Sequence, residues 1–139
     1  MYKALDIAKY VIDKCTRDNC PISNLQLQKI LYYIQKAFLN QGKHAFRDDI
    51  EAWQFGPVVP VVYRKYCMYG AMPIEENSEI HLNEDDRRII DTVIVQKRKI
   101  NPWTLVDDTH KAGGAWDIIY RHGVGNKNKI PDELIQKKG

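Results

Sequence analysis

The sequence feature that most constrains the fold is a strong helix start signal near residue 23. Ser23 and Gln26 have the S-x-x-Q spacing of a capping box, in which each side chain bonds the backbone amide of the other residue. Ile22 precedes the cap and can pack on Leu27 as a hydrophobic staple. Apolar residues then recur at three- and four-residue intervals until Gly42. The pattern predicts a long amphipathic helix over residues 23–41.

Similar signals predict the other helices. An apolar stripe runs from residue 4 to about residue 17, and Asn83 precedes a segment that is acidic at its start and basic at its end, as the helix dipole favours. Pro60 and Pro102 suit the first turn of a helix, and shorter helices are expected near Trp116 and after Pro131. We therefore expect a mainly α fold with six or seven helices.

Two short strands are also expected. Residues 50–54 alternate at period two, which is typical of a half-buried strand, and the triplet 80–82 is a second candidate. Between them, Gly56-Pro57-Val58-Val59-Pro60 cannot be a helix interior, because a proline has no amide donor and restricts the residue before it. We interpret this run as a rigid corner that leads into a helix ending at Gly70.

Length and charge indicate one domain. The 139 residues, 44% of them hydrophobic, can form one core but not two ordinary ones, so we expect a single domain over residues 1–139. In residues 121–139, Lys and Arg exceed Asp and Glu by three, which equals the net charge of +3 of the whole chain. We interpret residues 1–120 as a neutral core and residues 121–139 as a basic, solvated extension.

No feature indicates a membrane or an oxidising compartment. The sequence has no run of about 20 apolar residues and no signal peptide pattern. Its 3 cysteines are an odd number that suits a reducing environment, so a cytoplasmic location is expected.

Catalytic motifs are absent from the sequence. It contains no phosphate-binding glycine loop, no H-E-x-x-H zinc motif and no G-x-S-x-G nucleophile motif. His110 is the best acid–base candidate, because Asp107 would share its helix face, but its place beside Thr109 favours a packing or capping role. The acidic residues 84–86 are expected to cap a helix. We therefore predict no enzyme activity, no cofactor and no metal site.

Tyrosines on the predicted helices suggest a surface that contacts another protein. Neighbouring tyrosines 32 and 33 point about 100° apart on a helix, so at least one should reach the surface. Exposed tyrosines beside Gln and Lys are typical of protein contacts. The predicted contact residues are Tyr32, Gln35, Lys36, Tyr66 and Tyr69.

Three segments together resemble the Panacea antitoxin domain family, which is also called SocA-like or phage-associated GepA-like. They are Pro21–Tyr33, Ile50–Tyr63 with its Trp-Gln-Phe-Gly-Pro run, and Leu105–Trp116 with its Thr-His pair. The middle segment is the most specific, and the resemblance spans roughly residues 1–120.

The resemblance implies a helical, non-catalytic antitoxin that binds and neutralises a toxin encoded beside it, in a bacterial or phage-infected cell. One family member is described as delivering its toxin to a protease, so an adaptor role is implied as well. The motif residues should hold a rigid platform for the partner; these are Ser23, Gln26, Trp53, Gly56, Pro57, Tyr63, Thr109, His110 and Trp116.

Two alternatives remain open at this stage. Residues 4–17 and 23–41 could form a helix-turn-helix that binds DNA through Asn24, Gln28 and Lys29, but the second helix has few arginines, and nucleic acid is not the expected partner. A small hydrolase that uses His110 and Asp107 is the other alternative.

Overall fold

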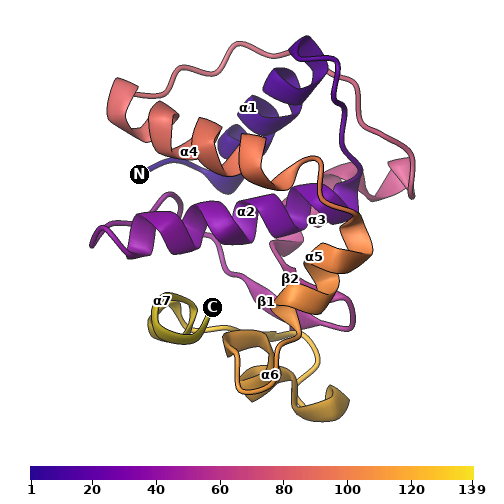
Figure 1. Ribbon diagram of the computed structural model, residues 1–139, viewed down its shortest axis with the longest axis vertical. Helices are drawn as coiled ribbons and strands as arrows, with labels where there is room; N and C mark the ends of the chain where they lie inside the picture. Colours follow the sequence, from indigo (N-terminus) through magenta and orange to yellow (C-terminus); the bar gives the residue numbers. More distant parts are fainter.

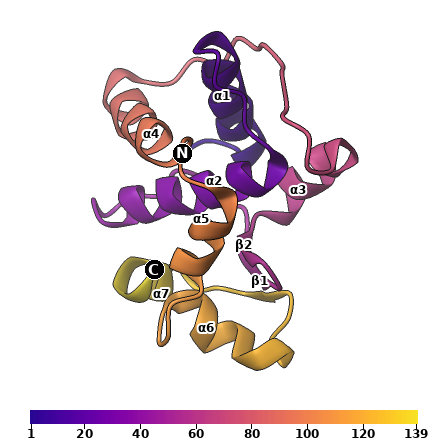
Figure 2. The same ribbon diagram turned by 45° about the vertical axis from the view of Figure 1, so that its right-hand side comes forward.

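A computed structural model describes residues 1–139, and one long helix, α2 (Asn24–Leu39), runs through the middle of the molecule (Figure 1). Both views place α1 and α4 on one side of α2, and the sheet, α6 and α7 on the other (Figures 1 and 2). The expected mainly α fold is confirmed, with seven α-helices and a small sheet. The remaining helices are α1 (Ala4–Arg17), α3 (Pro60–Tyr66), α4 (Glu84–Lys97), α5 (Pro102–Thr109), α6 (Ala115–Tyr120) and α7 (Asp132–Lys138).

The predicted capping box begins α2. The Ser23 hydroxyl accepts a hydrogen bond from the Gln26 amide at 3.3 Å, and the Gln26 side-chain oxygen accepts one from the Ser23 amide at 2.9 Å. The Gln26 side-chain amide also donates to the carbonyl of Arg98 at 3.1 Å, just after α4. The cap therefore starts the central helix and also fastens it to a second one.

The central position of α2 makes it unlike an ordinary surface helix. Most of its expected apolar stripe is buried, and several polar residues outside the stripe are buried as well, because elements pack on both sides. Four residues with polar groups are 2% exposed or less, namely Gln28, Lys29, Tyr32 and Gln35. Groups buried in this way need hydrogen-bond partners inside the protein.

The sheet has three antiparallel strands in the order β2-β1-β3. Strand β1 (Glu51–Trp53) confirms the strand expected at 50–54, and its register places Trp53 opposite Gly56. The expected corner contains β2 (Gly56–Val58), an edge strand in which a proline is tolerated.

The second strand expected from the sequence, at residues 80–82, is wrong. These residues form no strand and belong to a connector that leads from α3 over α1 to α4 (Figure 1). Side-chain hydrogen bonds hold the connector in place: the Ser78 amide donates to the carboxylate of Asp13, and its hydroxyl donates to the carbonyl of Lys9. Local alternation at Ile80-His81-Leu82 therefore has no neighbouring strand to pair with.

The segment 121–139 is part of the folded domain and not a solvated extension. Strand β3 (Asn128–Lys129) pairs with β1, and α7 packs on α2. Ile130 and Ile135 are fully buried, whereas the lysines around them face solvent. The lysines that make this segment basic are all on its exposed side, so its composition alone does not reveal the buried isoleucines.

No helix in the structure combines the length and the apolar character that a membrane span requires.

Candidate partner-binding groove

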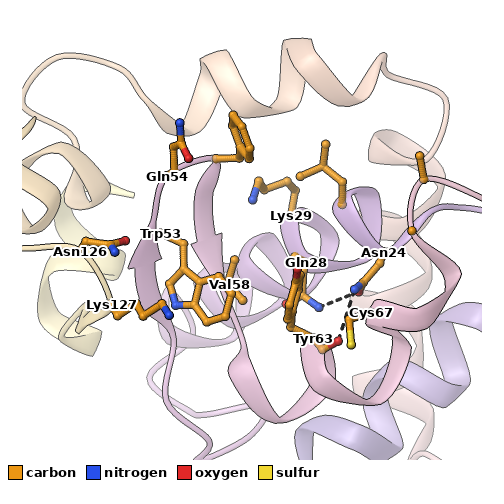
Figure 3. A pocket seen from close by; sticks show the side chains of 14 residues that line it. Asn24, Gln28, Lys29, Trp53, Gln54, Val58, Tyr63, Cys67, Asn126 and Lys127 are labelled. Atoms are coloured by element: carbon orange, nitrogen blue, oxygen red, sulfur yellow. Dashed lines mark hydrogen bonds between the residues drawn. The ribbon is translucent and has the colours of Figure 1, made fainter. Parts of the chain in front are cut away.

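A groove of about 570 Å³ lies beside the first half of α2, and we call it the α2 groove (Figure 3). Helix α2 contributes one side, the β1–β2 hairpin the second, and α3 with the turn after it the third. The loop before β3 completes the rim. The lining residues are Asn24, Leu25, Gln28, Lys29, Trp53, Gln54, Phe55, Val58, Tyr63, Cys67, Gly70, Ala71, Asn126 and Lys127.

Buried amide side chains of α2 hold the wall that follows β2. The Gln28 side-chain oxygen accepts a hydrogen bond from the Val59 amide at 2.8 Å, and its nitrogen donates to the side-chain oxygen of Asn24 at 2.9 Å. Asn24 in turn donates to the carbonyl of Tyr63 at 3.4 Å (Figure 3). This chain of bonds fixes the entry into α3 against α2, so the groove is largely preformed.

Large apolar side chains surround the groove and are exposed. Phe55 and Trp103 are 48% and 56% exposed, and their rings meet edge to face with centroids 5.4 Å apart. Met68 and Met72, which are sequence neighbours of the lining residues in the turn after α3, are 86% and 67% exposed. A cluster of exposed large apolar residues beside a groove is typical of an interaction site.

Lys29 is the most unusual residue of the groove wall. It is 0% exposed, and its ammonium group donates one hydrogen bond, of 3.0 Å, to the carbonyl of Pro57. No salt bridge compensates its charge. Burial therefore lowers the pKa of Lys29 from 10.5 to about 7. A buried, strongly perturbed group of this kind is characteristic of functional sites.

The Gly56-Pro57 and Thr109-His110 motifs meet at Lys29. Gly56 has a φ of +108°, which an L-residue rarely adopts, and a β-carbon there would lie 2.8 Å from the Thr109 hydroxyl oxygen and 2.9 Å from the Lys29 ε-carbon. Glycine is thus required both by the turn and by the close approach of side chains from α2 and α5 to this position. The Thr109 hydroxyl donates to the carbonyl of Val106 at 2.8 Å, inside its own helix.

An aromatic stack lies behind this junction. The rings of His110 and Trp116 are parallel with centroids 3.6 Å apart, and the Trp116 ring stacks on Tyr120 at 4.5 Å. The Trp116 indole donates to the carbonyl of Trp53 at 2.7 Å. The stack therefore joins α5 and α6 to the hairpin that forms one side of the groove.

The environment of His110 does not match the hydrolase alternative. Burial and the nearby Lys29 charge lower the pKa of His110, and its Nε2 atom is buried without a partner. Asp107 is exposed and makes no hydrogen bond to the imidazole. No group of three or more His, Cys, Asp or Glu residues is placed to hold a metal ion. His110 is a stacked packing residue in this structure.

The expected exposure of the predicted contact residues is wrong for three of the five. Tyr32 and Tyr66 are 2% and 1% exposed, and Gln35 is 1% exposed. Lys36 and Tyr69 are half-buried; the Lys36 ammonium donates to the carbonyl of Gly139, and the Tyr69 hydroxyl donates to Glu76. A contact role remains a prediction for these last two residues.

The burial of Gln35 has a clear reason. Its side-chain oxygen accepts hydrogen bonds from the amides of Ala45 and Phe46, at 2.9 and 3.4 Å, and its nitrogen donates to the carbonyl of Phe46 at 2.7 Å. The Gln35 side chain therefore makes the hydrogen bonds to the backbone of the loop after α2 that a neighbouring strand would make in a sheet. Tyr32 and Tyr66 belong to the hydrophobic core cluster.

The same central position removes the basis of the helix-turn-helix alternative. Asn24, Gln28 and Lys29, its candidate base-reading residues, are all 4% exposed or less. A recognition helix must itself enter the major groove of DNA, whereas α2 is covered by other elements on both sides.

Sequence reasoning missed most of the groove. The sequence pattern indicates Lys29 only as a candidate DNA contact and does not distinguish Phe55 or Trp103 from core aromatic residues. One usable signal is the polar series at residues 24, 28 and 35, which consists of amides instead of the charged side chains typical of a solvent face.

Comparisons with known proteins agree with this architecture. A family model described as "Antitoxin SocA-like, Panacea domain" matches residues 27–117. The chain is 35% identical to Antitoxin SocA of Caulobacter vibrioides (strain NA1000 / CB15N), over 95% of this chain and 79% of that protein. No solved structure matches the chain.

The chain therefore belongs to the family of SocA-like antitoxins with a Panacea domain. The resemblance noted in the three sequence segments is confirmed. Membership supports an antitoxin function, argues for a non-enzymatic regulator and implies a toxin as the general class of partner.

Proposed function

We propose that this protein neutralises a toxin by binding it directly in the α2 groove. The observation that carries the proposal is the exposed pair Phe55 and Trp103 at the edge of the groove. Leaving two such rings in water has a cost that a protein partner would remove. Membership in an antitoxin family identifies the class of partner.

The construction of the groove supports direct binding. The Phe55 ring lies on a hairpin that the Trp116 indole holds at the carbonyl of Trp53, and Trp103 follows an Asn101 cap at the start of α5. Rings placed on anchored elements lose little conformational freedom when a partner binds. The groove can therefore cover a toxin surface without rearrangement of the domain.

The test is co-expression with the product of the adjacent open reading frame, scored by growth and by the affinity of the purified pair. Phe55→Gln and Trp103→Gln remove the exposed rings and leave the core intact. Each should raise the Kd at least about tenfold, as expected for a hot-spot aromatic residue, and should reduce growth protection. Val95→Gln is the matched control, because Val95 is similarly exposed, at 54%, but lies on α4 away from the groove lining.

Toxin abundance is measured in the same cultures. Direct binding protects growth while the toxin level stays constant, whereas a protease adaptor protects growth by lowering that level. Protection that persists in both ring variants, with Kd values equal to that of Val95→Gln, would contradict the proposal.

A further inference from the structure

We propose that the α2 groove recognises an acidic side chain of the toxin, whose carboxylate pairs with the ammonium group of Lys29. This inference rests on the proposed function and adds the chemistry of the partner segment: an Asp or Glu flanked by apolar residues. The carboxylate would reach the groove wall, and its apolar neighbours would contact the Phe55 and Trp103 rings.

The first argument is the charge of the groove. Its lining contains two lysines, Lys29 in the wall and Lys127 at the rim, and no acidic residue. The other polar lining side chains are the amides of Asn24, Gln28, Gln54 and Asn126, the Tyr63 hydroxyl and the Cys67 thiol. A groove with this composition complements an anionic group and disfavours a cationic one.

The second argument is the unused hydrogen-bonding capacity of Lys29. An ammonium group has three donors, and Lys29 uses one, toward the carbonyl of Pro57 at 3.0 Å. Gln28 and Asn24, the nearest buried amides of the wall, are bonded to each other and to backbone groups. The other donors of Lys29 make no hydrogen bond in the structure, and a carboxylate of the toxin would accept one.

The third argument is the free-energy cost of burying the charged form of Lys29. Desolvation lowers its pKa to about 7, which means that the protein bears a cost for keeping an amine there. A methionine or leucine would fill the same volume without that cost. A paired carboxylate would raise the pKa of Lys29 again, because an opposite charge at hydrogen-bonding distance favours the protonated amine.

Lys29 shares the groove lining with exposed side chains of the hairpin. The hairpin tip Gln54-Phe55 is exposed, and both residues line the groove together with Lys29 (Figure 3). The ammonium group lies against the hairpin backbone, 3.0 Å from the Pro57 carbonyl, so the proposal requires these exposed side chains to move when the toxin binds, a change that is common at interfaces.

The experiment measures the affinity of the purified toxin for Lys29→Met, Lys127→Met and Lys138→Met variants. Lys29→Met should raise the Kd on the order of 30-fold, the loss typical of a buried charge pair, whereas Lys127→Met should raise it by less than about fivefold. Lys138 is exposed near the end of α7, outside the groove, so its variant should bind as the wild type does. Circular dichroism confirms that each variant is folded.

Cys67 reports whether the groove is occupied. It is exposed and lines the groove, whereas Cys15 is buried; the half-buried Cys20 is changed to serine. Bound toxin should slow the reaction of Cys67 with maleimide at least about tenfold. Carbodiimide coupling of the wild-type complex should then join Lys29 to an Asp or Glu of the toxin through an isopeptide bond, which mass spectrometry locates.

The outcomes separate the two proposals. No complex with wild-type protein, or a complex that leaves Cys67 fully reactive, would refute binding in the α2 groove. A complex that protects Cys67 but tolerates Lys29→Met within about threefold, and yields no cross-link at Lys29, would refute the carboxylate pairing alone.

Discussion

Replacing Lys29 with methionine should stabilise the free protein, and the gain should depend on pH. The amine has a pKa of 10.5 in an unfolded chain and about 7 in the folded one. At 1.36 kcal/mol for each unit of pKa, the difference corresponds to about 5 kcal/mol of lost stability when both states bind the proton. The variant loses the bond to the Pro57 carbonyl, which costs about 1–3 kcal/mol. The net gain at pH 6 should be about 2–4 kcal/mol.

The pH dependence has a definite sign. The folded pKa of Lys29 is lowered, so the unfolded state binds more protons between pH 7 and 10.5, and wild-type stability should rise with pH in that window. Lys29 should contribute a rise of about 3 kcal/mol between pH 6 and 9.5. Tyr66 acts in the opposite direction above this range, because burial raises its pKa to about 12, but it does so equally in both proteins.

The assay is urea unfolding followed by circular dichroism, at pH 6, 7, 8 and 9.5, for the wild type, Lys29→Met and the exposed control Lys138→Met. The gap in unfolding free energy between Lys29→Met and the wild type should shrink steadily as the pH rises. A gap that stays constant over this range, or a variant less stable than the wild type at pH 6, would refute the reasoning that Lys29 is buried without a charge partner.

Two further predictions concern the backbone. Gly56→Ala should cost about 3 kcal/mol of unfolding free energy, from strain at φ +108° and contact with the Thr109 hydroxyl; Gly42→Ala, at φ +76° with open space around it, should cost about 1 kcal/mol. Equal losses in the two alanine variants would contradict the close approach. Gln35→Leu should cost about 2–4 kcal/mol in urea unfolding, because it leaves the Phe46 carbonyl and two amides of its loop without partners; a loss below 1 kcal/mol would show that the loop is held otherwise.

Local sequence signals were sufficient for the helices because each start and stop is encoded within a few residues. Ser23 and Gln26 form the predicted box, and Asn83 caps α4 through its side-chain bond to the Asp86 amide. The double-proline segment likewise placed the start of α3 at Pro60. These features depend on short-range chemistry, which a sequence displays directly.

The features that the sequence did not predict depend on packing between distant parts of the chain. An amphipathic pattern indicates that α2 has a buried face, but it does not reveal that other elements also cover the polar face with Gln28, Lys29 and Gln35. Strand β3 has only two residues, and it is a strand only because it pairs with β1. The exposure of Phe55 and Trp103 is equally a property of the assembled fold, since aromatic residues are assigned to cores by default.

The pairing of β3 with β1 also has a consequence for synthesis on the ribosome. Strands β1 and β2 pair within residues 51–58, but β1 lacks its second neighbour until residues 128–129 have been translated. Asn126 and Lys127, which complete the rim, arrive equally late. A nascent chain therefore lacks part of the proposed binding groove until it is nearly finished, and toxin binding in that groove should require an almost complete polypeptide.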